Sequence, residues 1–247
     1  MARRSRTRTS PTPPLGNWDI STLELASGIL DGRELLFCSL RTGGLQLFRK
    51  VLGGGDEERV LKSDQIEFAH QYEDQRLKDG SILFSASDDV HAHAFYLLPP
   101  GKEGKPLRLS KPKFEEYAAR VSPDGKWVAY QSLESGRWEI YLAAFPTFTE
   151  KRQVSKDGGG DARWRKDERE LFYLSPDGKF MSVDVRTGNG LENGSPKILF
   201  QTSQQVQANG PDYCVTGDGK RFLFGEPVEE DSKPLTVVQN WTAGLKH

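Results

Sequence analysis

An Asp-Gly turn followed by a β-rich run recurs along this chain, and this repeat constrains the fold more than any other feature. Successive aspartates are 48, 45, 43 and 51 residues apart, and the fourth copy has Glu168 in place of Gly. Units of about 40–50 residues that each hold several short strands are typical of β-propeller blades. The five copies begin at Asp31, Asp79, Asp124, Asp167 and Asp218.

We therefore predict an all-β fold, a β-propeller of four-stranded antiparallel blades. Five blades are predicted, with an incomplete six-bladed ring as the alternative. In the third repeat the four strands fall at 117–121, 127–131, 138–142 and 151–154. Pro123 presets φ for the first turn, and Gly125 accepts positive φ at little cost. Asp124 and its equivalents are expected to accept hydrogen bonds from nearby backbone, so they are given no part in a site.

The two ends of the chain leave ring closure open. The fifth repeat offers strands at 213–215, 222–224 and 235–241 and lacks an outermost strand. Residues 18–25 serve either as the innermost strand of the first repeat or as the strand that completes the last blade, which would remove an exposed sheet edge. Residues 1–16 are expected to be a disordered, basic, Pro-rich tail, and 17–247 a single propeller domain.

Composition excludes some classes of protein. The mean hydropathy is −0.62 and no run of about 18 apolar residues occurs, so no membrane span is predicted. No apolar segment follows the N-terminal arginines, so no signal peptide is visible. The short basic tail is expected to be solvated, and no nucleic-acid partner is predicted. Cys38 and Cys214 are predicted to be small buried apolar residues and not a redox pair.

Residues 119–130, Ala-Arg-Val-Ser-Pro-Asp-Gly-Lys-Trp-Val-Ala-Tyr, and the matching run around Asp218 resemble the TolB-like, WD-like β-propeller family. Residues 117–245 also look like the C-terminal propellers of bacterial serine/threonine kinases, through the runs 134–137, 163–165, 170–179 and 234–245. This resemblance implies a propeller that follows a kinase domain and a membrane span and senses something outside the cytoplasm. The chain itself has no Gly-rich nucleotide loop, His-Arg-Asp or Asp-Phe-Gly, so the resemblance supports the fold and not phosphoryl transfer.

Two sets of residues, histidines and aromatic residues of the strands, are candidates for metal or ligand binding. His91 and His93 would face one side of a strand, and with His70 or Asp89 they would form a metal site. No third ligand stands at a fixed spacing, so we predict no metal and no cofactor. Trp127, Trp138, Tyr141 and Trp164 are expected to pack between blades, with a carbohydrate-stacking platform as the alternative.

Glu116, Asp161 and Asp212 each precede the innermost strand of successive blades. In a propeller such positions surround the mouth of the central channel, so we predict that these carboxylates line a ligand site there. Paired carboxylates at such a place would also serve a five-bladed glycoside hydrolase.

The sequence thus predicts an interaction or sensor module that binds a protein, a peptide or a small ligand at its loop face or channel mouth. It is predicted not to be an enzyme, because kinase, peptidase and nucleotide-binding motifs are absent. A glycoside hydrolase is the alternative. The compartment and the oligomeric state are not predicted.

Overall fold

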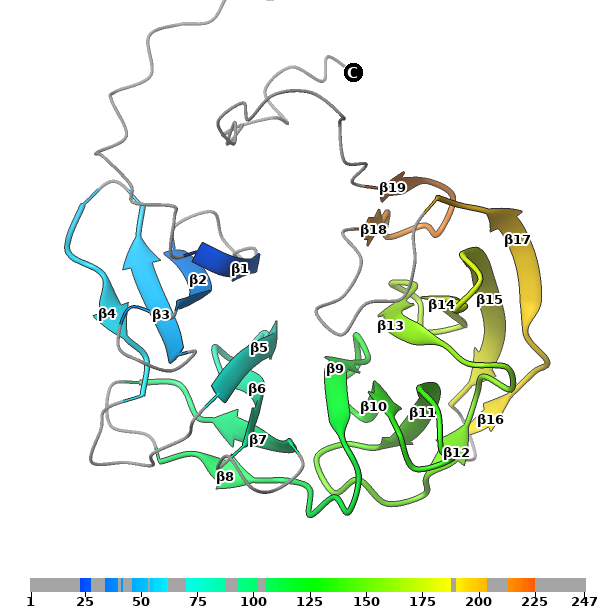
Figure 1. The fold of residues 1–247 in the computed structure, drawn as a ribbon, viewed down its shortest axis with the longest axis horizontal. Helices are drawn as coiled ribbons and strands as arrows, with labels where there is room; N and C mark the ends of the chain where they lie inside the picture. The colour runs from blue at the N-terminus through cyan, green and yellow to red at the C-terminus, as the bar shows by residue number, and fades with distance from the viewer. Residues whose placement is uncertain are drawn as a thin grey trace, which may run out of the picture.

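The computed structural model describes residues 23–27, 34–39, 41, 46–52, 54–61, 70–87, 93–101, 105–187, 190–203 and 213–224. All of the regular secondary structure in these ranges is β-strand in antiparallel sheets. Four sheets have four or five strands, and a fifth has two. The sheets follow one another around a common centre, each with one strand innermost (Figure 1). The predicted all-β propeller architecture is confirmed.

Sheets I and II each have four strands in chain order from the centre outward. Sheet I contains β1 (Leu23–Ser27), β2 (Glu34–Ser39), β3 (Gln46–Val51) and β4 (Glu58–Arg59). Sheet II contains β5 (His70–Arg76), β6 (Ile82–Ser87), β7 (Ala94–Leu98) and β8 (Leu107–Arg108). Because β1 pairs with β2 at the inner edge of sheet I, the N-terminal segment supplies the innermost strand of the first repeat.

Sheets III and IV match the sequence repeats closely. Sheet III contains β9 (Glu116–Val121), β10 (Trp127–Ser132), β11 (Glu139–Ala144) and β12 (Arg152–Gln153). Sheet IV contains β13 (Gly160–Trp164), β14 (Glu170–Leu174) and β15 (Lys179–Arg186). Both β16 (Glu192–Asn193) and β17 (Lys197–Gln201) pair with β15.

Sheet V contains two strands, β18 (Tyr213–Val215) and β19 (Phe222–Phe224). Its predicted third strand at 235–241 and the tail at 1–16 lie outside the described residues. The count of five blades and the domain boundary therefore stay predictions. Within the described ranges, no helix is long and apolar enough to cross a bilayer.

A β-bulge interrupts the innermost strand of each of the first four sheets. The register against the second strand shifts within β1, β5, β9 and β13. In β9 and β13 the bulge contains a residue at positive φ, Ala118 at 55° and Asp161 at 56°. A bulge disrupts the hydrogen-bond ladder of its own sheet, so the backbone there needs partners from elsewhere.

Side chains of neighbouring blades bond the backbone at these bulges. The amide of Ala119 donates to Asp74 Oδ1 of β5 at 2.9 Å. The amide of Asp161 donates to Gln131 Oε1 of β10 at 3.2 Å. The hydroxyl of Tyr213 on β18 donates to the carbonyl of Asp161. Sheets II to V are thus tied one to the next through the bulges of β9 and β13.

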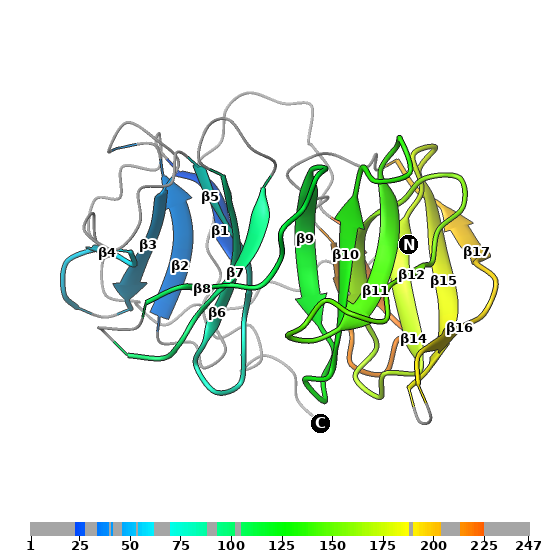
Figure 2. The same cartoon turned by 90° about the horizontal axis from the view of Figure 1, so that it is seen from below.

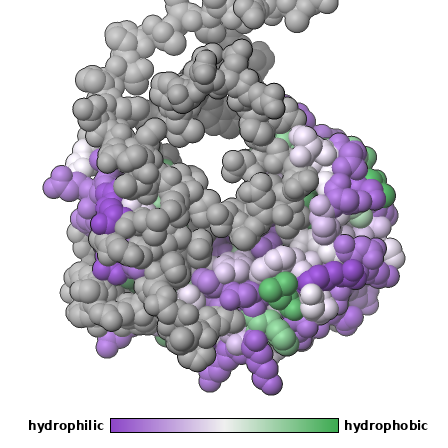
Figure 3. Space-filling model, viewed as in Figure 1, coloured by the Kyte–Doolittle hydropathy of each residue, from purple (hydrophilic) through white to green (hydrophobic). Residues whose placement is uncertain are grey.

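Apolar clusters fill the seams between neighbouring sheets, which stand face to face (Figure 2). In the II–III seam, Leu83 and Phe95 meet Tyr130. Each large side chain of this kind stabilises the fold by about 1.5–3 kcal/mol when it is fully buried. Trp127 and Trp164 pack in the III–IV seam, as predicted. The described surface on the side seen in Figure 3 is mainly hydrophilic, with apolar residues in small patches.

The two cysteines differ from each other. Cys38 on β2 is buried in the I–II seam, as predicted. Cys214 on β18 is exposed, so the prediction of burial is wrong for this residue. Successive side chains of a strand point to opposite faces. Because Tyr213 packs against sheet IV, Cys214 points away from it.

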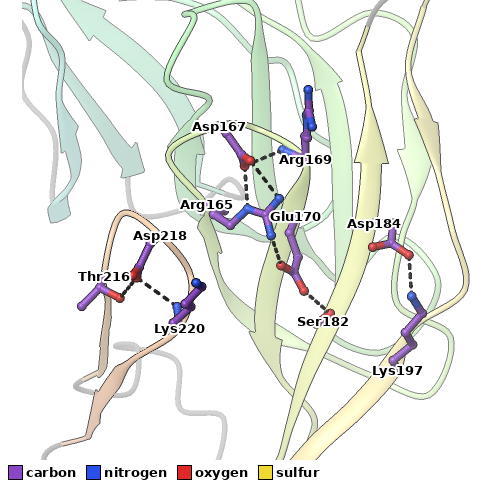
Figure 4. Close-up of polar contacts among 10 residues, drawn as sticks. All are labelled: Arg165, Asp167, Arg169, Glu170, Ser182, Asp184, Lys197, Thr216, Asp218 and Lys220. Carbon is purple, nitrogen blue, oxygen red and sulfur yellow. Dashed lines mark hydrogen bonds and ion pairs between the residues drawn. The ribbon is translucent and has the colours of Figure 1, made fainter.

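Asp79, Asp124, Asp167 and Asp218 of the repeated turns accept hydrogen bonds from nearby backbone, as predicted, and Asp31 lies outside the described residues. Asp218 accepts from the amide of Lys220 at 3.1 Å and from the hydroxyl of Thr216 at 2.5 Å (Figure 4). In the fourth repeat Arg165 replaces the hydroxyl, and its guanidinium donates to both oxygens of Asp167 at 2.6 and 2.8 Å. The aspartate holds the turn in both versions.

The fourth turn has a side chain in a position suited to glycine. Glu168 adopts a φ of 65°, close to the 77° and 69° of Gly125 and Gly219 in the corresponding turns. A residue with a Cβ is strained by about 1 kcal/mol or more in this region. Partial burial and the nearby Asp124 carboxylate also raise the pKa of Glu168.

We expect Glu168→Gly to raise the free energy of unfolding by about 1 kcal/mol, because glycine adopts positive φ without strain. Glu192→Gly is the matched control, since Glu192 lies in the extended strand β16 and glycine there should destabilise the fold. Urea unfolding followed by tryptophan fluorescence measures both changes. Equal destabilisation of the two variants would contradict strain at Glu168.

Candidate functional site

The innermost strands β5, β9 and β13 begin on one face of the ring, which we call the mouth face. The connections that lead into these strands and the turns between the second and third strands of each blade lie on the same face. Predicted site residues Glu116 and Asp161 belong to this face. The third, Asp212, lies outside the described residues.

Glu116 is buried in the II–III seam. It is the first residue of β9 and is 8% exposed. The Ser110 hydroxyl hydrogen-bonds its carboxyl, and Tyr130 lies nearby. Oε2 of Glu116 has no hydrogen-bond partner among the residues that the structure describes. Burial raises the pKa of Glu116 to about 7, because it outweighs the opposing effects of Ser110 and Lys151.

Asp161 is held where sheets III, IV and V meet. It is 1% exposed, and its backbone is bonded by Gln131 of β10 and Tyr213 of β18. Glu116 and Asp161 therefore have different neighbours, one at the II–III seam and the other at the inner strands further round the ring. The convergence of three carboxylates on one ligand stays a prediction.

The mouth end of the II–III seam also brings His93 together with Glu115 and Tyr117, which lie 22 and 24 residues further along the chain. Glu115 Oε2 lies 2.8 Å from His93 Nδ1 and 3.3 Å from the His93 amide nitrogen. Tyr117 Oη lies 2.7 Å from the same Nδ1. An ionised carboxylate can only accept hydrogen bonds, so Nδ1 carries the hydrogen that points to Glu115.

Glu115 is an anion at neutral pH. Burial alone would raise its pKa, but hydrogen bonds from His93 and Tyr117 outweigh burial, and the pKa lies below its usual range. The side chain of Glu115 is 37% exposed, so ligands in solution can reach the carboxylate. The fixed charge is therefore both preorganised and accessible.

Aromatic rings border this carboxylate. The ring centroid of Tyr117 lies 4.6 Å from that of His93 and 5.6 Å from that of Trp138. Phe114 immediately precedes Glu115 and is 46% exposed. We call Phe114, Glu115, Tyr117 and Trp138, with His93 behind them, the seam cluster.

The residues weighed as metal ligands are only partly described. Among the described residues, no group of three His, Cys, Asp or Glu side chains is placed to hold a metal ion. His93 contacts Glu115 and Tyr117 through Nδ1. His91, Asp89 and the side chain of His70 lie outside what the structure describes. The absence of a metal and of a cofactor stays a prediction.

A hollow of about 580 Å³ lies on the opposite face, beside the turn that contains Asp167. Three of the charged groups that line it are paired: Arg165 binds Asp167 as well as Glu170, and Asp184 binds Lys197 at 2.5 Å (Figure 4). Paired charges of this kind have less to offer a ligand than a partly exposed carboxylate. The seam cluster is therefore the better candidate site.

The sequence predicted a site at Glu116 and offered His93 only as a metal ligand, a role that was not adopted, and it did not identify Glu115, Tyr117 or Ser110. A weak signal existed for Ser110, because an apolar-Ser-Lys run follows the outer strand at both 109–111 and 154–156. In the structure the hydroxyl of Ser110 accepts a hydrogen bond from the amide of Phe95 on the third strand of its sheet, at 2.9 Å. The hydroxyl of Ser155 accepts the corresponding bond from Ile140 at 2.7 Å. Glu115 had no such signal, because it meets His93 across 22 residues and two sheets.

The comparisons with known proteins identify the fold. No family model and no curated protein matches the sequence. Among solved structures, TolB from Acinetobacter baumannii is 20% identical with a TM-score of 0.55, over 77% of this chain and 45% of that one. A puromycin-hydrolysing peptidase of Mycobacterium tuberculosis is 17% identical with a TM-score of 0.56, over 79% and 32%. An oligogalacturonate lyase in complex with manganese is 19% identical with a TM-score of 0.50, over 76% and 50%.

These similarities support a TolB-like propeller architecture and nothing finer, because the identities are low. This chain spans half or less of the length of each of the three proteins. The similarities to a peptidase and a lyase also overturn the prediction that the chain is not an enzyme. A peptidase and a lyase contain the same architecture at comparable similarity, so neither the fold nor the missing kinase and peptidase motifs exclude catalysis.

Two buried carboxyls make the stability of the II–III seam depend on pH. Burial raises the pKa of Asp74, as of Glu116, to about 7, although Arg120 and the Ala119 amide oppose it. In the folded state both groups bind protons more tightly than in the unfolded chain. Their stabilising contribution is therefore complete below pH 4 and is lost as the pH rises through about 7.

We expect the free energy of unfolding to fall between pH 5 and pH 8, with about 2 kcal/mol of the decrease due to Glu116. Glu116→Gln should flatten the curve by that amount, because the amide resembles the protonated acid. Glu115→Gln is the control. Because the pKa of Glu115 is lowered, the contribution of this group to the free energy of unfolding is lost only at acidic pH. Urea unfolding at several pH values measures all three proteins. An unchanged slope in Glu116→Gln would contradict the assignment.

Proposed function

We propose that this propeller is an interaction module that binds a protein or peptide ligand on its mouth face, at the seam cluster. The observation that carries the proposal is that two consecutive residues just before β9 are exposed, an aromatic side chain, Phe114, and, in part, a fixed anion, Glu115. Binding energy at protein interfaces concentrates in a few such anchors. Among the described residues on the side seen in Figure 3, apolar side chains occur in small patches, which suits recognition by a few residues.

Rigidity of the seam supports the proposal. His93 holds Glu115 through two nitrogens, and Tyr117 packs between His93 and Trp138. A site whose side chains are already ordered loses little conformational entropy when a ligand binds. Glu116 and Asp161 are buried, so in this proposal they shape the channel mouth and do not touch the ligand directly.

The finer resemblance to kinase-linked propellers belongs to the same proposal. It rests on sequence runs between 117 and 245, and the likeness to TolB supports the shared architecture. In this view the chain senses a ligand for a larger receptor. The ligand-binding face would then be the mouth face.

Selection from a random-peptide phage library on the full chain tests the proposal. Selected peptides should bind about tenfold more weakly to Phe114→Ala, because an exposed aromatic anchor is lost. Lys126→Ala is the control, since Lys126 is 75% exposed in a turn on the opposite face. Isothermal titration calorimetry measures the affinities. Peptides that lose affinity with Lys126→Ala, or with neither variant, would contradict binding at the mouth face.

A second candidate function, glycoside cleavage, is favoured by Glu116. Its pKa of about 7 is suited to a general acid at neutral pH. We expect that any hydrolysis of aryl glycosides by the full chain is lost in Glu116→Gln and kept in Glu192→Gln, because Glu192 is an exposed carboxylate on β16 of another sheet. Release of the aryl alcohol measures the rate. No release from a broad panel of glycosides, or release that Glu116→Gln retains, would contradict this candidate.

A further inference from the structure

We propose that the seam cluster recognises a basic side chain, lysine or arginine, of its ligand, with Glu115 as the counter-ion. This inference deepens the proposed function and rests on it. It names the chemistry that the ligand must carry at the point where it meets the II–III seam.

Among the described residues, the charge of Glu115 is held in place by hydrogen bonds and has no lysine or arginine counter-ion. Glu115 is ionised at neutral pH, and the ion-pair partner that the described residues give it is His93. A partly exposed carboxylate in this position attracts a cation from solution, and the attraction is stronger beside low-dielectric aromatic groups than in bulk water.

The aromatic surroundings select the kind of cation. Tyr117 and Trp138 have ring centroids 5.6 Å apart, and Phe114, the residue before Glu115, is exposed. An ammonium or guanidinium group gains energy over the face of such rings, most of all over tryptophan. Arginine adds planar stacking and two parallel hydrogen bonds to a carboxylate. A hydrated inorganic cation gains none of these contacts.

The hydrogen-bond network leaves the carboxylate available to such a ligand. His93 donates to Oε2 through its ring and its amide, and Tyr117 also bonds the carboxylate. These donors orient the group, and the 37% of the Glu115 side chain that faces solvent offers the remaining acceptor positions. A neutral hydroxylated ligand, such as a sugar, would use the same rings and would not need the charge.

NMR titration of the full chain with N-acetyl-arginine amide and N-acetyl-lysine amide tests this inference, with the Trp138 indole signal as the reporter. N-acetyl-citrulline amide is the matched neutral probe, because it has nearly the shape of arginine without the charge. We expect citrulline amide to bind at least about fivefold more weakly than arginine amide. Glu115→Gln should weaken binding of arginine amide by a similar factor and leave citrulline amide unchanged.

Glu134→Gln is the control variant, since this carboxylate lies in the neighbouring turn and is already paired with Lys151. It should bind arginine amide as the unmodified chain does. Circular dichroism confirms that Glu115→Gln is folded, and Phe114→Ala, at an exposed position, provides a second test with an expected loss of about twofold. Equal affinities for arginine and citrulline amides would overturn the inference, as would unchanged affinity in Glu115→Gln.

Failure of this inference can be told from failure of the proposed function. One outcome is that selected peptides lose affinity for Phe114→Ala and yet bind Glu115→Gln as tightly as the unmodified chain. In that case the mouth face is the binding face, and the inference that the ligand carries a basic side chain there is wrong. If selected peptides bind independently of Phe114 while arginine amide still needs Glu115, the cation site exists and the proposed function is wrong.

Discussion

The bond between the Asp74 carboxylate and the Ala119 amide is the interaction on which the rest of this structure depends most. The innermost strands carry bulges, and a bulge breaks the ladder that would otherwise use every backbone group. Buried amides need partners, and here the preceding blade supplies them: Asp74 bonds Ala119, and Gln75 bonds the amide of Val121 at 2.6 Å. These polar contacts fix the angle and the height of sheet II relative to sheet III. Apolar packing alone would not specify that relation.

This fixed relation between β5 and β9 also builds the candidate site. Glu115 lies just before β9 and His93 just before β7. A small sliding of one sheet against the other would separate the carboxylate from the imidazole. The bonds at the bulge prevent such sliding and therefore preorganise the seam cluster, although none of the bulge residues belongs to it.

Local and non-local features of the chain differ in how far the sequence predicts them. The turns at Asp124 and Asp218 and the strands beside them follow from residues that are neighbours in the sequence, and the structure confirms them. Burial of Cys214 was predicted wrongly, because the face of a three-residue strand depends on what packs against it. The bulges, which decide which side chain of each innermost strand faces the seam, leave no clear mark in the sequence.

The neighbours Glu115 and Glu116 show how the sequence can point to a position without deciding which side chain is accessible there. The sequence indicates an acidic residue where β9 begins, and either glutamate satisfies that pattern. Glu116 turns into the seam, where burial raises its pKa to about 7, so that it holds its proton to a much higher pH than an exposed glutamate does. Glu115 turns to the surface, where hydrogen bonds from His93 and Tyr117 keep it ionised. Environment separates two chemically identical groups into a structural acid and an accessible anion, and only the anion is suited to attract a charged ligand.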